Sequence, residues 1–175
     1  PVKSMPGFVV KQSGPRTLLQ DFGRYGFHHL GMTTGGPADS VAFRWANRLC
    51  KNDLSTTVLE VSVGGLILEC SAETQIAVCG ANMPLTINGR VEGVIAYLAV
   101  AGGFDVALSF GSTATVVREG IGGLNGNKLE SGDYLPCSSN NGNNNQDKDD
   151  DNRCLKLPKG YHPVYGHHVM LRVIP

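Results

Sequence analysis

Residues 58–69, with the sequence VLEVSVGGLILE, decide the fold class of this chain. Two short apolar runs, 58–61 and 66–68, lie on either side of Gly64-Gly65. Such a pattern is typical of two β-strands that are joined by a hairpin turn or interrupted by a bulge. Glu60 stands inside the first run, and a glutamate on a strand more often faces solvent than belongs to a functional site.

Further strands are expected on both sides of this stretch, because short runs rich in Val, Ile, Leu and Thr alternate with glycine-rich turns. Glycine accounts for 23 of the 175 residues, about twice its usual share. Asn88-Gly89 is a strong signal for a two-residue hairpin turn, and a buried Tyr97 hydroxyl needs a hydrogen-bond partner. The chain is predicted to be mainly β, with strands at residues 7–12, 58–61, 66–68, 75–79, 85–87, 94–101, 113–117 and 169–174, and residues 17–20 form a further short apolar segment.

One short amphipathic helix is predicted over residues 38–49, ADSVAFRWANRL. Its apolar residues recur at helical spacing and define one face. Pro37 suits the first turn of a helix, and Asp39 complements the positive end of the helix dipole. The predicted face consists of Val41, Ala42, Trp45, Ala46 and Leu49.

Composition excludes several classes of protein. The 15 Lys and Arg residues balance 15 Asp and Glu residues, whereas nucleic-acid binders usually carry a basic surplus. No apolar run approaches the roughly 20 residues that span a bilayer. The first five residues, PVKSM, lack the apolar region of a secretory signal. A hydrophobic fraction of 41% is enough to build a core, so we expect a folded protein without nucleic-acid or membrane partners.

The cysteines indicate a reducing, cytoplasmic compartment. Their number is odd, and no two of them have the C-x-x-C spacing of zinc or redox motifs. Cys70 and Cys79 lie in apolar stretches and are predicted to be small core residues. The five cysteines are Cys50, Cys70, Cys79, Cys137 and Cys154.

The densest polar cluster lies in the glycine-rich segment 21–39, which is predicted to be an ordered loop. In a functional interpretation, Asp21 and Arg24 orient a polar substrate, and the planar guanidinium of Arg24 binds a carboxylate. In a structural interpretation, the two side chains pair with each other and with backbone amides, and so brace the loop. His28-His29 lacks a further ligand at metal-binding spacing, so no metal site is predicted.

Glycine-rich turns elsewhere give only weak signals for phosphate binding. Gly35-Gly36-Pro37 precedes the predicted helix, but Asp39 in its first turn repels an anion. Segments 101–105 and 120–123 are better explained as turns, because neither has the G-x-x-x-x-G-K-[ST] pattern of a phosphate loop. Residues 138–152, SSNNGNNNQDKDDDN, have no apolar anchor and are predicted to be a disordered insertion or linker. The predicted organisation is a β-rich part at 1–137, this linker, and the start of a second β segment at 153–175, truncated at residue 175.

Six stretches taken together resemble one protein family. The combination of Q-D-x-G-R-x-G, the A-N-R-L helix and A-Y-L-A-V-A-G-G is specific to it. The chain resembles the second subunit of allophanate hydrolase-type proteins, which is also called the Kip-A type, the carboxyltransferase A/B domain or the 5-oxoprolinase C subunit. The stretches are TLLQDFGRYGFHHLGMTTGGPAD (17–39), AFRWANRLCKN (42–52), VLEVSVGGLILE (58–69), AVCGAN (77–82), AYLAVAGGFDV (96–106) and GSTAT (111–115).

The resemblance implies a cyclophilin-related β-barrel and a heteromeric assembly. The implied partners are a companion subunit of the Kip-I or allophanate hydrolase subunit 1 type and, in one branch, a third subunit of the LamB/YcsF type. That branch opens 5-oxoproline to glutamate with ATP, which this chain is not expected to bind itself. The alternatives are the carboxyltransferase of a biotin-dependent urea-type carboxylase and a non-catalytic regulatory subunit.

The resemblance also turns the polar cluster into a hypothesis about an active site. Asp21 and Arg24 are the expected catalytic residues: Arg24 binds a substrate carboxylate, and Asp21 positions it or transfers a proton. Gln20, Asp39 and Asn47 are expected to support substrate binding. Family members usually carry roughly twenty more residues after the turn at Asn88-Gly89 and continue past residue 175, so the chain is expected to be a partial member.

Overall fold

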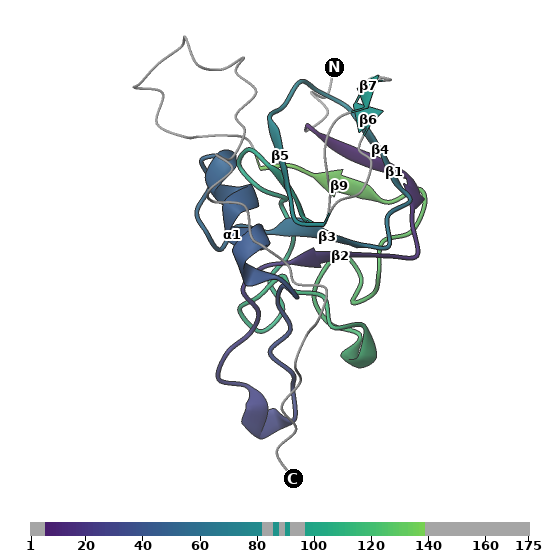
Figure 1. Ribbon diagram of the computed structural model, residues 1–175. Helices are drawn as coiled ribbons and strands as arrows, with labels where there is room; N and C mark the ends of the chain where they lie inside the picture. Colours follow the sequence, from purple (N-terminus) through teal and green to yellow (C-terminus); the bar gives the residue numbers. More distant parts are fainter. Residues whose placement is uncertain (1–5, 82–85, 88–89, 92–96, 139–175) are drawn as a thin grey trace, which may run out of the picture. The chain divides into compact units, whose positions relative to one another are not determined.

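The computed structural model describes residues 6–81, 86–87, 90–91 and 97–138 (Figure 1). The chain divides into two units, Pro1–Asn145 and Gln146–Pro175, and every described residue belongs to the first. The predicted strand at 169–174 and segment 153–175 lie outside the described residues, as does the predicted linker beyond Ser138. The predicted domain boundaries therefore stay predictions.

The described part is built on two antiparallel sheets (Figure 1), which confirms the prediction of a mainly β fold. One sheet has the order β4-β1-β9, and the other has the order β2-β3-β8-β5. A third pairing joins β6 (Thr86–Ile87) to β7 (Arg90–Val91), with Ile87 opposite Arg90, which confirms the predicted hairpin. The strands of the two sheets are β1 (Gly7–Ser13), β4 (Leu66–Cys70), β9 (Tyr134–Pro136), β2 (Arg16–Gln20), β3 (Val58–Ser62), β8 (Tyr97–Val100) and β5 (Ile76–Cys79).

The stretch 58–69 does not form a hairpin, because β3 and β4 belong to different sheets. Val63, Gly64 and Gly65 have φ angles of 67°, 77° and 76° and lead the chain from one sheet to the other. The reason lies in how each strand is covered. The first four residues of β3 are buried, which suits a position between β2 and β8, whereas β4 alternates half-buried and exposed residues as an edge strand does.

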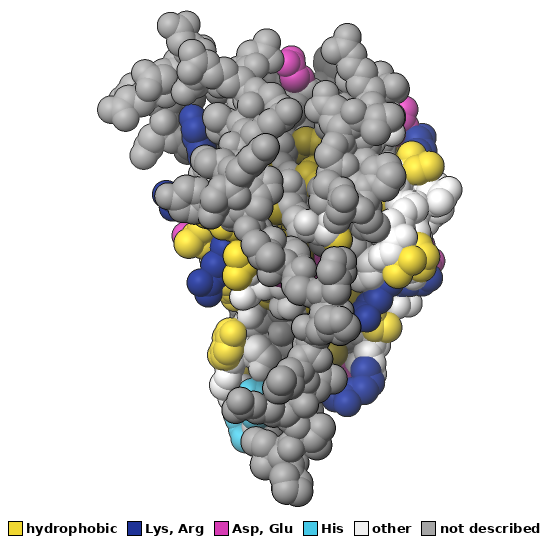
Figure 2. All heavy atoms as spheres, in the orientation of Figure 1, with side chains coloured by type: hydrophobic (Ala, Val, Ile, Leu, Met, Phe, Trp, Pro, Cys, Tyr) yellow, Lys and Arg dark blue, Asp and Glu magenta, His cyan; other side chains and the backbone are white. Residues whose placement is uncertain are grey.

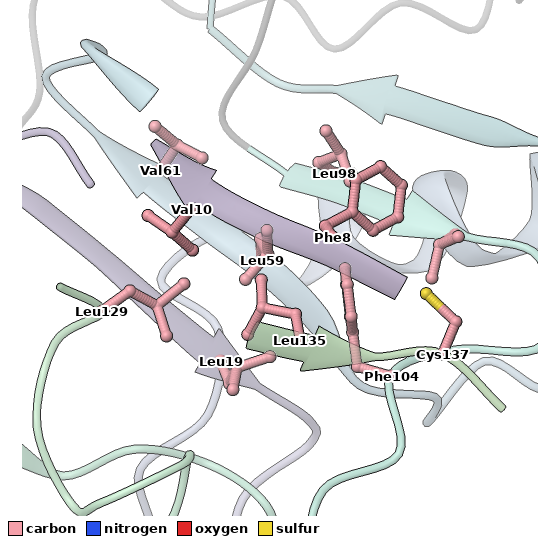
Figure 3. Packing of buried hydrophobic residues seen from close by; sticks show 11 residues of the cluster. Phe8, Val10, Leu19, Leu59, Val61, Leu98, Phe104, Leu129, Leu135 and Cys137 are labelled. Carbon is pink, nitrogen blue, oxygen red and sulfur yellow. The ribbon is translucent and has the colours of Figure 1, made fainter. Parts of the chain in front are cut away.

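The main core consists of buried side chains contributed by both sheets (Figure 3). Phe8 and Val10 of β1 lie in the same cluster as Leu59 and Val61 of β3, since alternate residues of a strand share a face. Each fully buried side chain of this size contributes about 2 kcal/mol of hydrophobic free energy. The other members are Leu19, Leu98, Val100, Phe104, Leu129, Leu135 and Cys137.

Helix α1 (Ser40–Leu49) packs on β5 and β8 and covers a second core cluster. Asp39 is its N-cap, and the Oδ1 atom accepts hydrogen bonds from Val41 N at 2.9 Å and Ala42 N at 3.0 Å. The helix is confirmed, and the predicted face is right at Ala42 and Ala46 but wrong at Val41. Its buried residues are Ala42, Phe43, Ala46 and Asn47, whereas the side chain of Val41 is 51% exposed.

Residues 113–117 do not form the predicted strand. This segment is irregular and leads into the 3-10 helix η2 (Val117–Glu119). Its backbone groups bond to separate partners rather than to one neighbouring strand: Thr115 N donates to Leu19 O at 2.9 Å, and Gly123 N donates to Thr113 O at 2.7 Å. Within the described ranges, no helix is long and apolar enough to cross a membrane.

Candidate functional site: a polar cleft beside the glycine-rich loop

A cleft of about 420 Å³ opens where three segments meet, and we call it the polar cleft. The segments are the loop after β2, the residues that precede β3, and the irregular segment after β8. Ordered loops that converge on a sheet commonly carry binding residues, because the sheet fixes their ends. The lining residues are Asp21, Phe22, Gly23, Ser55, Thr56, Thr57, Phe104, Asp105, Val106, Leu108, Gly111 and Thr113.

Asp21 lines the polar cleft and ties the glycine-rich loop to the segment opposite. Its Oδ1 atom accepts hydrogen bonds from Gly23 N at 2.8 Å and from Ser112 Oγ at 2.5 Å. Its Oδ2 atom accepts one from Thr113 N at 2.7 Å. Both carboxylate oxygens are therefore fixed by the protein, an arrangement that holds the two loops together and favours positioning over proton transfer.

Arg24 belongs to the same loop but does not line the polar cleft, and it is only 2% exposed to solvent. Its Nη2 atom donates to Ala114 O at 2.5 Å, and its Nε atom donates to Ser109 O at 3.4 Å. Its Nη1 atom is buried without a hydrogen-bond partner among the described residues. A Cβ atom at Gly122, where φ is 74°, would collide with Ala114 O and approach Nη2 to 2.9 Å, so this turn requires glycine.

Asp21 and Arg24 do not form a salt bridge with each other within the described part of the chain. Each side chain instead binds the backbone of residues within 109–114. The two residues therefore brace the loop, as the structural interpretation expects, but without pairing with each other. A further contact joins the loop to η2, because Glu119 Oε1 accepts hydrogen bonds from Thr33 N at 3.2 Å and Thr33 Oγ1 at 3.0 Å. The catalytic roles predicted for Asp21 and Arg24 stay predictions.

Three buried side chains hold the backbone that leads into α1. Gln20 Oε1 accepts a hydrogen bond from Gly36 N at 3.2 Å, and Glu60 Oε2 accepts one from Ala38 N at 2.9 Å. Tyr97 Oη accepts one from Asp39 N at 2.6 Å and donates to Glu60 Oε2 at 2.8 Å. The residues come from adjacent strands β2, β3 and β8, and so fix the helix N-terminus to the sheet.

This network corrects one expectation and confirms another. Glu60 is 8% exposed and faces the protein interior, not solvent, because Tyr97 and a backbone amide satisfy its carboxylate there. Tyr97 has the hydrogen-bond partner that its burial requires, and burial raises the pKa of its hydroxyl above the ordinary value. Glu60 and Tyr97 together hold the backbone at the end of the loop that reaches the polar cleft.

Asp39 and Asn47, both predicted to support substrate binding, do not line the polar cleft. Asp39 caps α1. Asn47 is fully buried; its Nδ2 atom donates to Thr56 O at 2.8 Å, and its Oδ1 atom accepts from Asn52 at 3.2 Å. Since Thr56 lines the polar cleft, Asn47 contributes to the shape of the cleft wall through the backbone.

Sequence reasoning missed five polar residues that line the polar cleft: Ser55, Thr56, Thr57, Asp105 and Thr113. The hydroxyls of Thr57 and Thr113 lie 2.7 Å apart, although 56 positions separate them in the sequence. Asp105 is exposed at the cleft. The A-G-G-F-D and G-S-T-A-T stretches contain two of these residues, so the family motifs were the available signal.

The lining residues give the polar cleft an acidic character. Asp21 and Asp105 supply two carboxylates, and the twelve lining residues include no Lys, Arg or His. Carboxylate and hydroxyl oxygens accept hydrogen bonds from N–H groups, so the arrangement suits a small polar molecule rich in such donors. None of the lining residues forms a nucleophile–base pair that would attack a substrate.

Metal binding has no support in the described residues, which contain no group of three His, Cys, Asp or Glu side chains placed to hold an ion. His28 Nε2 instead lies 3.2 Å from Thr34 Oγ1 within the loop of the 3-10 helix η1 (His28–Leu30). Figure 2 shows the described histidine side chains at the lower end of the molecule.

Comparison with known proteins matches the chain to the family described as carboxyltransferase domain, subdomain A and B, over residues 30–92 and 90–175. The chain belongs to this family. The two matched stretches meet near residue 91, where the sequence is expected to lack a stretch that other members carry.

Relatives within the family carry two kinds of name. The 5-oxoprolinase C subunit of Escherichia coli is 36% identical over 148 residues, which cover 73% of this chain and 48% of that protein. A putative urea carboxylase of Emericella nidulans is 36% identical over 179 residues, which cover 89% of this chain and 14% of that protein. This chain therefore spans about half the length of the Escherichia coli relative.

A solved structure agrees with these relatives. The crystal structure of the Kluyveromyces lactis urea carboxylase superposes with a TM-score of 0.73 at 32% identity, covering 79% of this chain and 14% of that one. The mainly β fold of this chain is thus similar to one part of a structurally characterised relative.

Proposed function

We propose that this chain forms one wall of a site for a small amide in an ATP-dependent, multi-subunit enzyme. The observation that carries the proposal is the acidic lining of the polar cleft, where Asp21 and Asp105 present carboxylates to a cavity of about 420 Å³. The named relatives support it, because 5-oxoproline and urea are both small molecules with N–H groups next to a carbonyl. Carboxylates recognise such N–H groups well.

The first candidate reaction is the ATP-dependent opening of 5-oxoproline to glutamate. Its support is the likeness to the 5-oxoprolinase C subunit, whose name makes it one part of a larger enzyme. An unstrained lactam needs activation of its carbonyl, by phosphorylation or by a strong oxyanion site. This chain has no phosphate-loop motif, so the activated carbonyl has to be formed with companion subunits, of which the Kip-I type is the expected partner.

In this candidate reaction, Arg24 binds the carboxylate of the substrate. Its unpartnered, buried Nη1 atom is the feature that supports such a role, since a buried cation without an anionic partner is unfavourable. Arg24 is 2% exposed, so direct contact with the substrate requires the loop to open. Without such opening, a companion subunit has to supply the cation that the acidic cleft lacks.

The second candidate is carboxyl transfer within a biotin-dependent urea-type carboxylase. One feature of the polar cleft favours it: urea presents only N–H donors and a neutral carbonyl to the protein, so it suits a lining with two carboxylates and no basic residue. The likeness to the Kluyveromyces lactis urea carboxylase supports the same candidate. This reaction depends on bicarbonate and a biotinylated partner, which the first does not.

The experiment that tests the proposal reconstitutes both reactions with the full-length protein. In one arm, the protein is mixed with its two expected companions, ATP and 5-oxoproline, and glutamate is measured. In the other arm, urea, bicarbonate and a biotinylated carboxylase partner replace them. We expect activity in one arm, and loss of that activity when this chain is omitted. A stable complex without turnover in either arm would contradict the proposal and favour a regulatory subunit.

A further inference from the structure

A second hollow lies on the outer surface of α1 and shares no lining residue with the polar cleft. It has a volume of about 250 Å³ and is lined by Val41, Arg44, Trp45, Arg48 and Leu54; we call it the α1 groove. Figure 2 shows hydrophobic and basic side chains together along the edge of the molecule where α1 lies in Figure 1. None of the groove's lining residues has a role in the proposed function, although Arg44 contacts Phe22, which lines the polar cleft.

The α1 groove exists because the buried face of the helix is turned away from Val41, which the apolar pattern places on that face. Phe43, Ala46 and Asn47 point into the protein, which leaves Val41 51% exposed on the outside. Leu54, from the segment after the helix, is 42% exposed at the same groove. Large apolar side chains grouped at a surface hollow commonly mark a binding site rather than random exposure.

The two arginines, Arg44 and Arg48, give the α1 groove a positive charge. Arg44 and Arg48 are one helical turn apart and so project from the same side of α1. The guanidinium of Arg44 lies 5.0 Å from the centroid of the Phe22 ring, and that of Arg48 lies 5.9 Å from the Trp45 ring. Within the described part of the chain, neither arginine forms a salt bridge with an acidic side chain.

We propose that the α1 groove binds a short acidic segment of a partner protein that carries one aliphatic side chain. The aliphatic side chain enters the hollow between Val41 and Leu54, and carboxylates pair with Arg44 and Arg48. The aromatic contacts restrict both guanidiniums, so less rotamer entropy is lost when carboxylates bind. A hollow of about 250 Å³ accommodates one anchor side chain. In many interfaces, a few such side chains in pockets supply most of the binding energy.

The chain offers a direct optical probe of this groove, because Trp45 is its single tryptophan. The full-length protein is titrated with an acetylated, amidated pentapeptide of four aspartates around a central leucine, and Trp45 emission is recorded. Comparison peptides replace the leucine with serine, or the aspartates with lysines. The variant is Arg44→Glu/Arg48→Glu, and the control is Arg16→Glu, which reverses an exposed arginine on β2.

We expect saturable binding of the acidic leucine peptide, weakened about tenfold by the double variant and by about 0.5 M salt. The Arg16→Glu variant should bind as the unmodified protein does, and the serine and lysine peptides should bind more weakly. Equal binding by the double variant or by the lysine peptide would overturn the proposal, as would the absence of a saturable change in emission.

A further control addresses the acidic segment of the chain itself. The residues Asp147, Asp149, Asp150 and Asp151 are replaced together by asparagine. If a partner protein is the occupant, Trp45 emission and peptide affinity stay unchanged. A change in emission together with several-fold tighter peptide binding would show that the chain's own segment occupies the α1 groove, and would overturn the assignment to a partner.

Discussion

Tyr97 on β8 lies directly opposite Glu60 on β3, and its hydroxyl donates a 2.8 Å hydrogen bond to Glu60 Oε2. The two side chains also accept hydrogen bonds from the backbone amides of Ala38 and Asp39, which immediately precede α1. A polar cross-strand pair therefore fixes the start of the helix to the centre of the sheet. The same backbone continues from the glycine-rich loop that lines the polar cleft.

Replacing Tyr97 with phenylalanine is expected to destabilise the protein. The change removes the hydroxyl, and so leaves the half-buried Asp39 N without this acceptor and the buried Glu60 without one donor. Unsatisfied buried groups cost about 1–3 kcal/mol each, so we expect the free energy of unfolding to fall by about 2 kcal/mol. Urea denaturation measures this. The control is Tyr25→Phe, at a residue that is 70% exposed; equal losses in both variants would refute the role of the pair.

Replacing Arg24 with alanine is expected to lower the free energy of unfolding by about 2 kcal/mol, because the carbonyls of Ala114 and Ser109 lose their donor. Thermal and urea denaturation of the variant measure the effect. The matched control is Arg16→Ala, at an exposed arginine on β2. A variant that assembles normally and keeps full activity would remove Arg24 from substrate binding.

The buried thiols are expected to resist alkylation at pH 8. Burial raises the pKa of Cys50 to about 12 and that of Cys137 to about 11, so their thiolate fractions at pH 8 are far smaller than that of a free cysteine. Cys70 is exposed, contrary to its predicted place in the core, and should react first. Mass spectrometry after a short iodoacetamide pulse measures the order; faster labelling of Cys50 than of Cys70 would contradict the structure.

The contact between Glu119 and the glycine-rich loop is expected to depend on pH. Hydrogen bonds from Arg118 and then from Thr33 lower the pKa of Glu119. A lowered pKa means that the contact is complete above the unfolded value, about 4.3, and is lost as the pH falls through the folded one. The Thr33 amide resonance should therefore titrate with a midpoint below about 4.3. The Glu119→Gln variant should abolish this titration, and a midpoint at or above the ordinary value would contradict the contact.

Features that depend on neighbouring residues could be predicted from the sequence. Asn88-Gly89 indicates its hairpin, and the apolar spacing of residues 38–49 indicates α1. The buried face of α1 could be predicted only in part. Ala42 and Ala46 lie on it as expected, but the burial of Phe43 depends on where its ring meets Tyr97 on β8. Burial of Glu60 has the same origin, since the tyrosine that satisfies its carboxylate lies 37 positions away.

The candidate site was predictable only in part for the same reason. Gln20, Asp21 and Arg24 are recognisable as a polar cluster within a short stretch of sequence around the glycines. Their partners lie far along the chain: Asp21 binds an amide 92 positions away, at Thr113. Apart from the family motif G-S-T-A-T, no local pattern marks residues 109–115 as partners, and the strand predicted at 113–117 is replaced by irregular backbone that makes some of these contacts.

The most direct measurement for the proposed small-amide site is the kinetic effect of Asp105→Asn on the reconstituted full-length enzyme. Asp105 is exposed in the polar cleft, so the change alters the cleft without removing a buried contact. Glu73→Gln, at an exposed acidic residue outside the cleft, is the matched control. We predict a KM for the amide substrate raised about tenfold or more for Asp105→Asn, the loss of one charge-assisted hydrogen bond, with no change for Glu73→Gln. Unchanged kinetics in both variants would contradict the assignment of the polar cleft as the substrate site.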